Sequence, residues 1–156
     1  MKPAQTGQLP PAAVEVMKPT QLGALPPAAV GGLKAEQVSA LPPEAMTTMK
    51  PTQVAALKPA AMAGLEPGQV DALPPSAMRQ VSDKQLGAIP ADAMKSLDTA
   101  QINALPTEAF KGMKPDQANA LTPDQARAMS PQDVQQMPPA VRTIVNALKA
   151  QPPAGA

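Results

Sequence analysis

Large apolar residues recur every eight positions along almost the whole chain. When the sequence is cut into eights, with positions a to h, position a is always Leu, Met, Val or Ile, and position f is usually apolar. Position c is usually Pro. The eights pair into a sixteen-residue unit, because the odd eights from Gln5 to Gln117 carry Gln at position e and most even eights carry Ala there. This regularity is typical of a repeat protein.

The proline at position c predicts many short helices instead of one long helix. Proline disrupts a helix interior but suits the first helical position. We therefore expect a helix of about one and a half turns over positions c to h, with an extended link at a and b. The segments at 122–125 (TPDQ) and 130–133 (SPQD) also have the pattern of a capping box. Where b is Lys or Pro, we expect a weaker helix start.

Such short helices need stacking to be stable, because nucleating a single turn is unfavourable. Position f and the following a can share one face of each unit. The predicted fold is therefore an all-α, elongated solenoid over residues 1–139. Its expected coil is the sixteen-residue unit, made of two eight-residue units, with odd helices on one side, even helices on the other and a narrow apolar core between them.

The octad pattern breaks after Pro139. An amphipathic stripe follows at spacings of three, four and seven: Val141, Ile144, Val145 and Leu148. We predict a C-terminal capping helix over 140–150 and a disordered tail over 151–156. The N-terminal face has no matching cap, and Thr6 replaces the usual apolar residue at f.

Composition restricts the alternatives. The chain has 22 Pro and one aromatic residue, Phe110, so a conventional globular core is not expected. Phe110 is predicted to be a large core residue that compensates for Ala118 and Ala126 at f. A Pro-rich flexible linker is the structural rival, but a linker has no reason to keep apolar residues at position a.

The net charge and the length of the apolar runs indicate which partners the chain can bind. The net charge of +1 and the scarcity of aromatic residues predict no nucleic-acid binding, and no apolar run is long enough to span a bilayer. The first residues lack the apolar stretch of a signal peptide. The absence of Cys favours an extracellular setting only slightly, so the localisation stays open.

The residue inventory predicts a protein without catalytic activity. The chain lacks His, Cys, Tyr and Trp, and its acids fall at different repeat positions. No phased acid–base pair, phosphate-binding loop or metal-ligand cluster appears. We expect no cofactor and no metal.

Two repeated polar positions are candidate surfaces. The Gln at e could form a binding ladder along one flank: Gln21, Gln37, Gln53, Gln69, Gln85, Gln101 and Gln117. The alternative, which we favour because e adjoins the core-facing f, is that each Gln caps its own helix or bonds the backbone of a neighbouring coil. A loose basic edge is formed at b by Lys2, Lys18, Lys34, Lys50 and Lys114. A solvated surface is the simplest interpretation of this edge, and an anionic partner is the alternative.

Units such as LTPDQARA and LPPEAMTT resemble the short octapeptide repeats (L-x-P-x-Q-V-x-A type) of large bacterial surface and secreted proteins. The resemblance implies a bacterial surface or secreted setting. Three functions remain open: a rod-like spacer, stalk or scaffold; a module that recognises a protein or polysaccharide along one flank; and a subunit that self-associates end to end through its uncapped N-terminal face.

Overall fold

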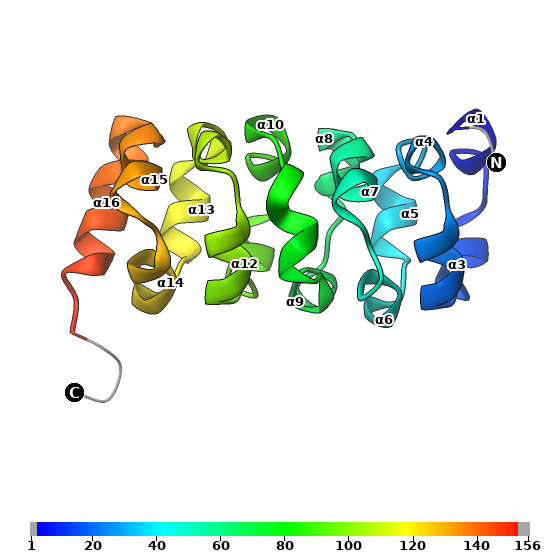
Figure 1. Cartoon of the computed structure of the whole chain (residues 1–156), viewed down its shortest axis with the longest axis horizontal. Helices are drawn as coiled ribbons and strands as arrows, with labels where there is room; N and C mark the ends of the chain where they lie inside the picture. The colour runs from blue at the N-terminus through cyan, green and yellow to red at the C-terminus, as the bar shows by residue number, and fades with distance from the viewer. Residues whose placement is uncertain (1–2, 153–156) are drawn as a thin grey trace.

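The structure consists of short helices that begin every eight residues. The computed structural model describes residues 3–152, and their side chains from residue 5 onward. Within this range it has eighteen helices and no strand, and thirteen of the helices begin at a proline. Figure 1 shows an elongated array with α1 at one end and α16 at the other. The prediction of an all-α fold made of many short helices is confirmed.

The helices stack in three columns, because each helix contacts the helix three places further along the chain. The first column contains α1 (Pro3–Thr6), α4 (Pro27–Val30), α7 (Pro51–Ala56), η1 (Pro75–Gln80), α12 (Thr99–Ala104) and α14 (Pro123–Ala128). The second contains α2 (Pro11–Glu15), α5 (Ala35–Ser39), α8 (Pro59–Met62), α10 (Asp83–Leu86), η2 (Thr107–Gly112) and α15 (Pro131–Gln136). The third contains α3 (Pro19–Ala24), α6 (Pro43–Met46), α9 (Pro67–Ala72), α11 (Ala91–Met94), α13 (Pro115–Ala120) and α16 (Pro139–Lys149). The helices η1 and η2 are of the tighter 3₁₀ type.

Three consecutive helices, each from one eight-residue unit, therefore complete one coil. The predicted sixteen-residue coil with two helices is wrong. The helix α3, which begins at Pro19, contacts α6, which begins at Pro43, and not α5, which begins at Ala35. Because three is an odd number, Gln-bearing and Ala-bearing helices alternate down each column as far as α12, η2 and α13, instead of lying on two sides. The sixteen-residue sequence period records this alternation in chemistry, whereas the coil length depends on how the chain turns at each link.

The core is one continuous cluster along the length of the stack. From Ala29 to Val141, the residues at positions e, f and a of every repeat are buried. Methionines at f, such as Met46 and Met62, are no more than 1% exposed. Their flexible thioether chains suit the irregular spaces between small helices.

Phe110 lies at the level of the core where its neighbours at f are smallest. It is fully buried, as are Ala118 and Ala126. These residues lie on η2, α13 and α14, which are three consecutive helices and so form one coil. One large and two small side chains therefore occupy the same level, which agrees with the predicted compensation and with the close packing of protein interiors.

The last helix, α16, is about twice the usual length and contacts α13, α14 and α15. Val141 and Val145 are buried, while Ile144 and Leu148 are partly buried against the core. The helix ends at Lys149, close to the predicted end. Of the predicted tail, residues 153–156 lie outside the described residues.

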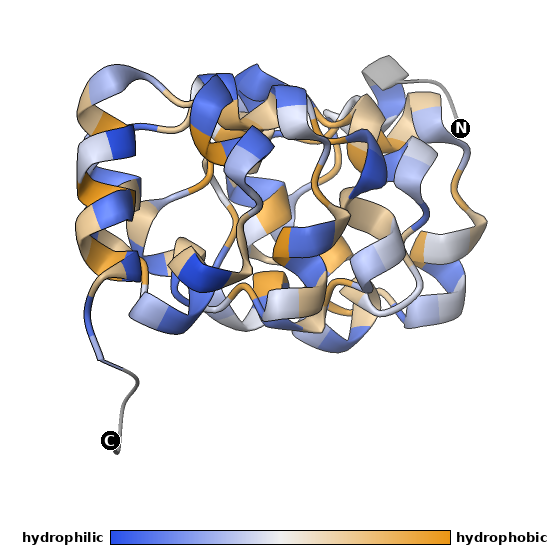
Figure 2. Ribbon diagram, turned by 60° about the vertical axis from the view of Figure 1, so that its left-hand side comes forward, coloured by the Kyte–Doolittle hydropathy of each residue, from blue (hydrophilic) through white to orange (hydrophobic). Residues whose placement is uncertain are grey.

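No helix in the described part of the chain is long and apolar enough to cross a lipid bilayer. Figure 2 shows apolar and hydrophilic residues alternating over short distances along the ribbon.

Glycines allow helices of one column to approach closely. A Cβ atom on Gly112 would overlap the carbonyl oxygen of Asp83, which lies in the preceding helix of the same column. At Gly68 the nearest atom, Cγ of Pro43, would be 3.6 Å away, an ordinary contact distance.

We predict opposite effects of alanine at these two glycines. Gly112→Ala should lower the free energy of unfolding by about 1–3 kcal/mol, because η2 and α10 must separate. Gly68→Ala, the matched control inside α9, should raise it by roughly 0.5–1 kcal/mol through helix propensity. Urea unfolding of the two variants measures both. Equal effects would contradict the close approach.

Candidate functional site

The glutamines at position e lie inside the stack. Of the seven considered as a flank ladder, Gln21 is exposed, and the other six are at most 3% exposed: Gln37, Gln53, Gln69, Gln85, Gln101 and Gln117. They are divided among all three columns, because consecutive odd helices fall in different columns. The ladder along one flank, the less favoured of the two interpretations, is therefore wrong, and the favoured one, in which each Gln caps its own helix or bonds the backbone of a neighbouring coil, is confirmed. From Ala29 onward, position e faces the neighbouring coil, not solvent.

The Oε1 atom of each of these glutamines caps the helix that carries it. In α12, the backbone N–H of Asp98 donates to Oε1 of Gln101 at 2.8 Å. The equivalent bond, between the residue at b and the Gln at e, is 2.8–2.9 Å long in α3, α5, α7, α9, α10 and α13. A lysine at b therefore still has its N–H paired, although its side chain cannot accept the return bond of a capping box.

The Nε2 atom of each buried glutamine joins its coil to the preceding one. In Gln101 it donates to the carbonyl oxygens of Val70 and Leu73, both at 2.7 Å. These acceptors lie at the end of one helix and in the link to the next. Helix C-terminal carbonyls lack partners within their own helix. One amide thus satisfies a helix start in its own coil and two carbonyls in the coil before.

Gln125 makes the same three contacts, although it lies in an even repeat and was predicted only as a helix cap. Its Oε1 accepts from Thr122 N at 2.8 Å, and its Nε2 donates to the carbonyls of Met94 and Leu97 at 2.9 and 2.7 Å. The hydroxyl of Thr122 completes the reciprocal pair by accepting from Gln125 N. In the next repeat, Ser130 and Asp133 form the other predicted reciprocal pair.

Positions b and e vary together, and the bonding geometry explains why. Wherever e is Gln, b is a residue with a backbone N–H, and this N–H donates to the Gln in every described case from α3 onward. Wherever b is Pro, e is Ala or, at Val141, another apolar residue. Proline has no N–H to satisfy, so a small apolar residue can take the place of the amide. Lys58 with Ala61 is the exception. This covariation is visible in the sequence and agrees with the favoured prediction that each Gln caps its own helix.

The lysines at b do not form one basic edge. Lys18, Lys34, Lys50 and Lys114 are exposed, but they precede helices in different columns. Lys2 lies outside the described residues. The predicted basic edge is therefore distributed around the stack, which weakens its attraction for a single anionic surface.

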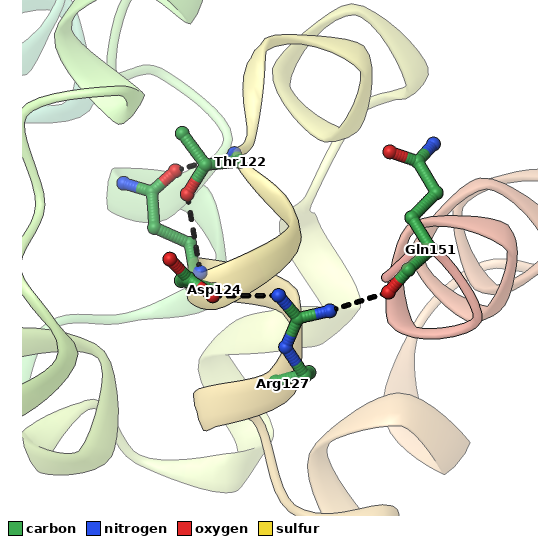
Figure 3. A network of polar contacts seen from close by, with 5 residues as sticks. Thr122, Asp124, Arg127 and Gln151 are labelled. Atoms are coloured by element: carbon green, nitrogen blue, oxygen red, sulfur yellow. Dashed lines mark hydrogen bonds and ion pairs between the residues drawn. The ribbon is translucent and has the colours of Figure 1, made fainter. Parts of the chain in front are cut away.

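Cationic side chains bond the carbonyls at the C-terminal end of the stack. Arg142 donates to the carbonyl oxygens of Val134 (3.2 Å), Gln135 (2.7 Å) and Met137 (3.2 Å). Lys149 Nζ donates to Met129 O at 2.6 Å. In Figure 3, Arg127 lies between Asp124 of its own helix and the carbonyl of Gln151 beyond α16, at 2.6 and 2.8 Å. These bonds fasten α16 to the last coil.

A hollow on the second column is lined by residues that include Asp83, Lys84, Gly87, Gly112 and Lys114. Across the described residues, no three His, Cys, Asp or Glu side chains are grouped so that they could hold a metal ion. The organised chemistry of this molecule is therefore the hydrogen bonding of the glutamine network.

The sequence matches no protein-family model, and a comparison with curated proteins finds no match.

Proline substitution at b should test the covariation of b and e. Lys58→Pro should raise the free energy of unfolding by about 0.4–1 kcal/mol. The φ of Lys58 is −70°, which proline adopts without strain, and the Ala61 side chain accepts no bond from the Lys58 N–H.

Lys50→Pro is the matched control. Lys50 N donates to Gln53 Oε1 at 2.9 Å, and its φ is −90°, so this variant should be destabilised. Thermal and urea unfolding of both variants are the measurements, and stabilisation of both would contradict the rule.

Removing a buried glutamine should cost far more than removing the exposed one. Gln101→Ala deletes three hydrogen bonds and leaves buried backbone groups unpaired, so we expect a loss of about 2–4 kcal/mol. Gln21→Ala deletes only the bond from Lys18 N and should cost less than about 1 kcal/mol. Urea unfolding compares the two variants, and losses of equal size would show that the link between coils contributes little.

Proposed function

We propose that this chain is a non-catalytic solenoid segment that acts as a rigid spacer or scaffold. The observation that carries the proposal is the contact pattern. Each helix contacts the helices three places before and after it in its column, and the core and the glutamine network continue from coil to coil. In such a structure, added repeats lengthen the stack without changing the existing contacts.

In this proposal α16 is the cap of the stack. Its apolar stripe covers the last coil, and Arg142 and Lys149 take the carbonyls that a further coil would otherwise use. An open end would expose apolar side chains and unpaired carbonyls, which favours aggregation.

The proposed setting is the one implied by the octapeptide resemblance, a bacterial surface or secreted protein. The near-neutral charge and the scarcity of aromatic residues support a role without nucleic acid. The lack of His and Cys supports a role without catalysis, cofactor or metal.

The recognition module is the weaker alternative. It requires one exposed repeat position that keeps the same residue type although packing does not require it. The glutamines at position e were the candidate. Except in Gln21, their amides are buried and already bonded, so a flank-binding partner would need another row of side chains. The self-associating filament is also weaker, because α16 contacts the last coil.

The spacer proposal predicts that length follows repeat number. Duplicating residues 33–80 after residue 80 adds six helices, or two coils, and keeps the alternation of Gln and Ala. We expect the maximum dimension in small-angle scattering to increase by about 16–20 Å, at 8–10 Å per stacked helix. A single cooperative unfolding transition should be retained.

The control carries the same insert with its residues at f changed to Ser. It has equal length in sequence but cannot pack its core, so it should form an unfolded loop and show no ordered extension. If both inserts change the scattering in the same way, the chain behaves as a flexible linker and the proposal fails.

A further inference from the structure

The two ends of the stack differ in the state of position e. In the first coil, Gln5, Ala13 and Gln21 are exposed. In all later coils the residue at e is buried against the preceding coil, beginning with Ala29 on α4. The exposed e positions of α1, α2 and α3 therefore form the surface on which a preceding coil would stack, and we call these three helices the N-terminal face.

Gln21 has the first bond of the glutamine network but not the second. Its Oε1 accepts from Lys18 N at 2.8 Å, as in the later coils. Its Nε2 donates to no carbonyl within the described residues, whereas Nε2 of Gln37 donates to Thr6 O and Leu9 O at 2.9 and 2.6 Å. The capping bond already holds the side chain in the arrangement used for joining coils.

The N-terminal face also exposes apolar surface. Val16, which follows α2, is 76% exposed and is the one exposed large hydrophobic residue among those described. Leu9, Met17 and Leu25 at position a are only partly buried, whereas position a is buried from Leu33 onward. A polar donor beside apolar surface is the combination that every internal junction of the stack buries.

At the opposite end of the stack, the equivalent carbonyls already accept hydrogen bonds. Val134 and Met137 occupy the positions whose carbonyls accept from Gln Nε2 at internal junctions, and both accept from Arg142 instead. The core below α16 is covered by Val141 and Val145. A second copy of this chain therefore cannot dock head to tail without displacing α16.

We propose that the N-terminal face binds, end-on, the uncapped last coil of another polypeptide built from the same octapeptide repeat. The partner would present its helix-end carbonyls to Gln21 and its Leu, Val or Met side chains to Leu9, Met17 and Val16. The internal junctions supply the template, because residues 41–64 do the same for the coil that follows them: Gln85 donates to Val54 O and Leu57 O at 2.8 and 2.7 Å. This inference rests on the face itself and does not depend on the spacer role.

The test uses the full chain and a labelled peptide with the sequence of residues 17–64. This peptide comprises two coils, and its last residue is the end of a complete eight-residue unit. We expect saturable binding by fluorescence anisotropy. Gln21→Ala and Val16→Lys should each weaken it about tenfold or more, the size expected for two lost hydrogen bonds or a buried charge. Both residues are exposed, so these variants should keep the circular dichroism of the parent chain.

A peptide with residues 21–68 is the register control, because it ends in the middle of a repeat and should bind weakly. If the free peptide is too unfolded to bind, a flexible Gly/Ser linker that joins it ahead of Met1 raises its effective concentration to about millimolar. Hydrogen exchange should then show protection in the peptide that Gln21→Ala removes.

Three results would overturn the proposal: equal binding of both peptides, binding insensitive to both substitutions, or no protection in the tethered form. Sedimentation of the chain without peptide tests whether two copies of the chain bind each other through this face. Concentration-dependent dimers that Val16→Lys abolishes would make a second copy, head to head, the occupant in place of a repeat partner.

Discussion

Every coil of this protein depends on satisfying the backbone groups that a proline-interrupted helix leaves unpaired. A helix of four to six residues has more free N–H and C=O groups than internal bonds, and its ends here are packed inside a stack. At alternate links, the glutamine amide provides hydrogen-bond partners for these unpaired groups. Its oxygen accepts the N–H at a helix start, and its nitrogen donates to two carbonyls of the coil before.

This interaction determines spacing as well as stability. The side chain reaches one N–H in its own link and two carbonyls of the preceding coil, as Gln117 reaches those of Leu86 and Ile89, so its length limits how far apart the coils can lie. Among the described residues, no buried side-chain polar atom lacks a hydrogen-bond partner, so the amides cost little by being buried. Most links without Gln use Pro, which removes the donor instead of pairing it; the exceptions are Lys58 with Ala61 and Ser130 with Asp133.

The same bonding explains why the two ends are unequal. At the C-terminal end, Arg142 and Lys149 donate to carbonyls of the kind that accept from Gln Nε2 at internal junctions. At the N-terminal face, Gln21 keeps its capping bond and its donor group remains available for a carbonyl. The proposed end-on partner would take up this donor, and the proposed spacer would then be one part of a longer repeat assembly.

The sequence by itself determined what depends on neighbours along the chain. The helix starts, the eight-residue period, the buried positions f and a, the two reciprocal caps and the amphipathic last helix all follow from proline geometry, capping and apolar spacing. Only the tertiary structure decided that three helices complete a coil and that one Gln amide both caps its own helix and bonds two carbonyls of the preceding coil. The reason is physical: the turn at each link is set by how helices three repeats apart pack together, and the sixteen-residue alternation of Gln and Ala reports bonding within the links, which is the same for any number of helices per coil.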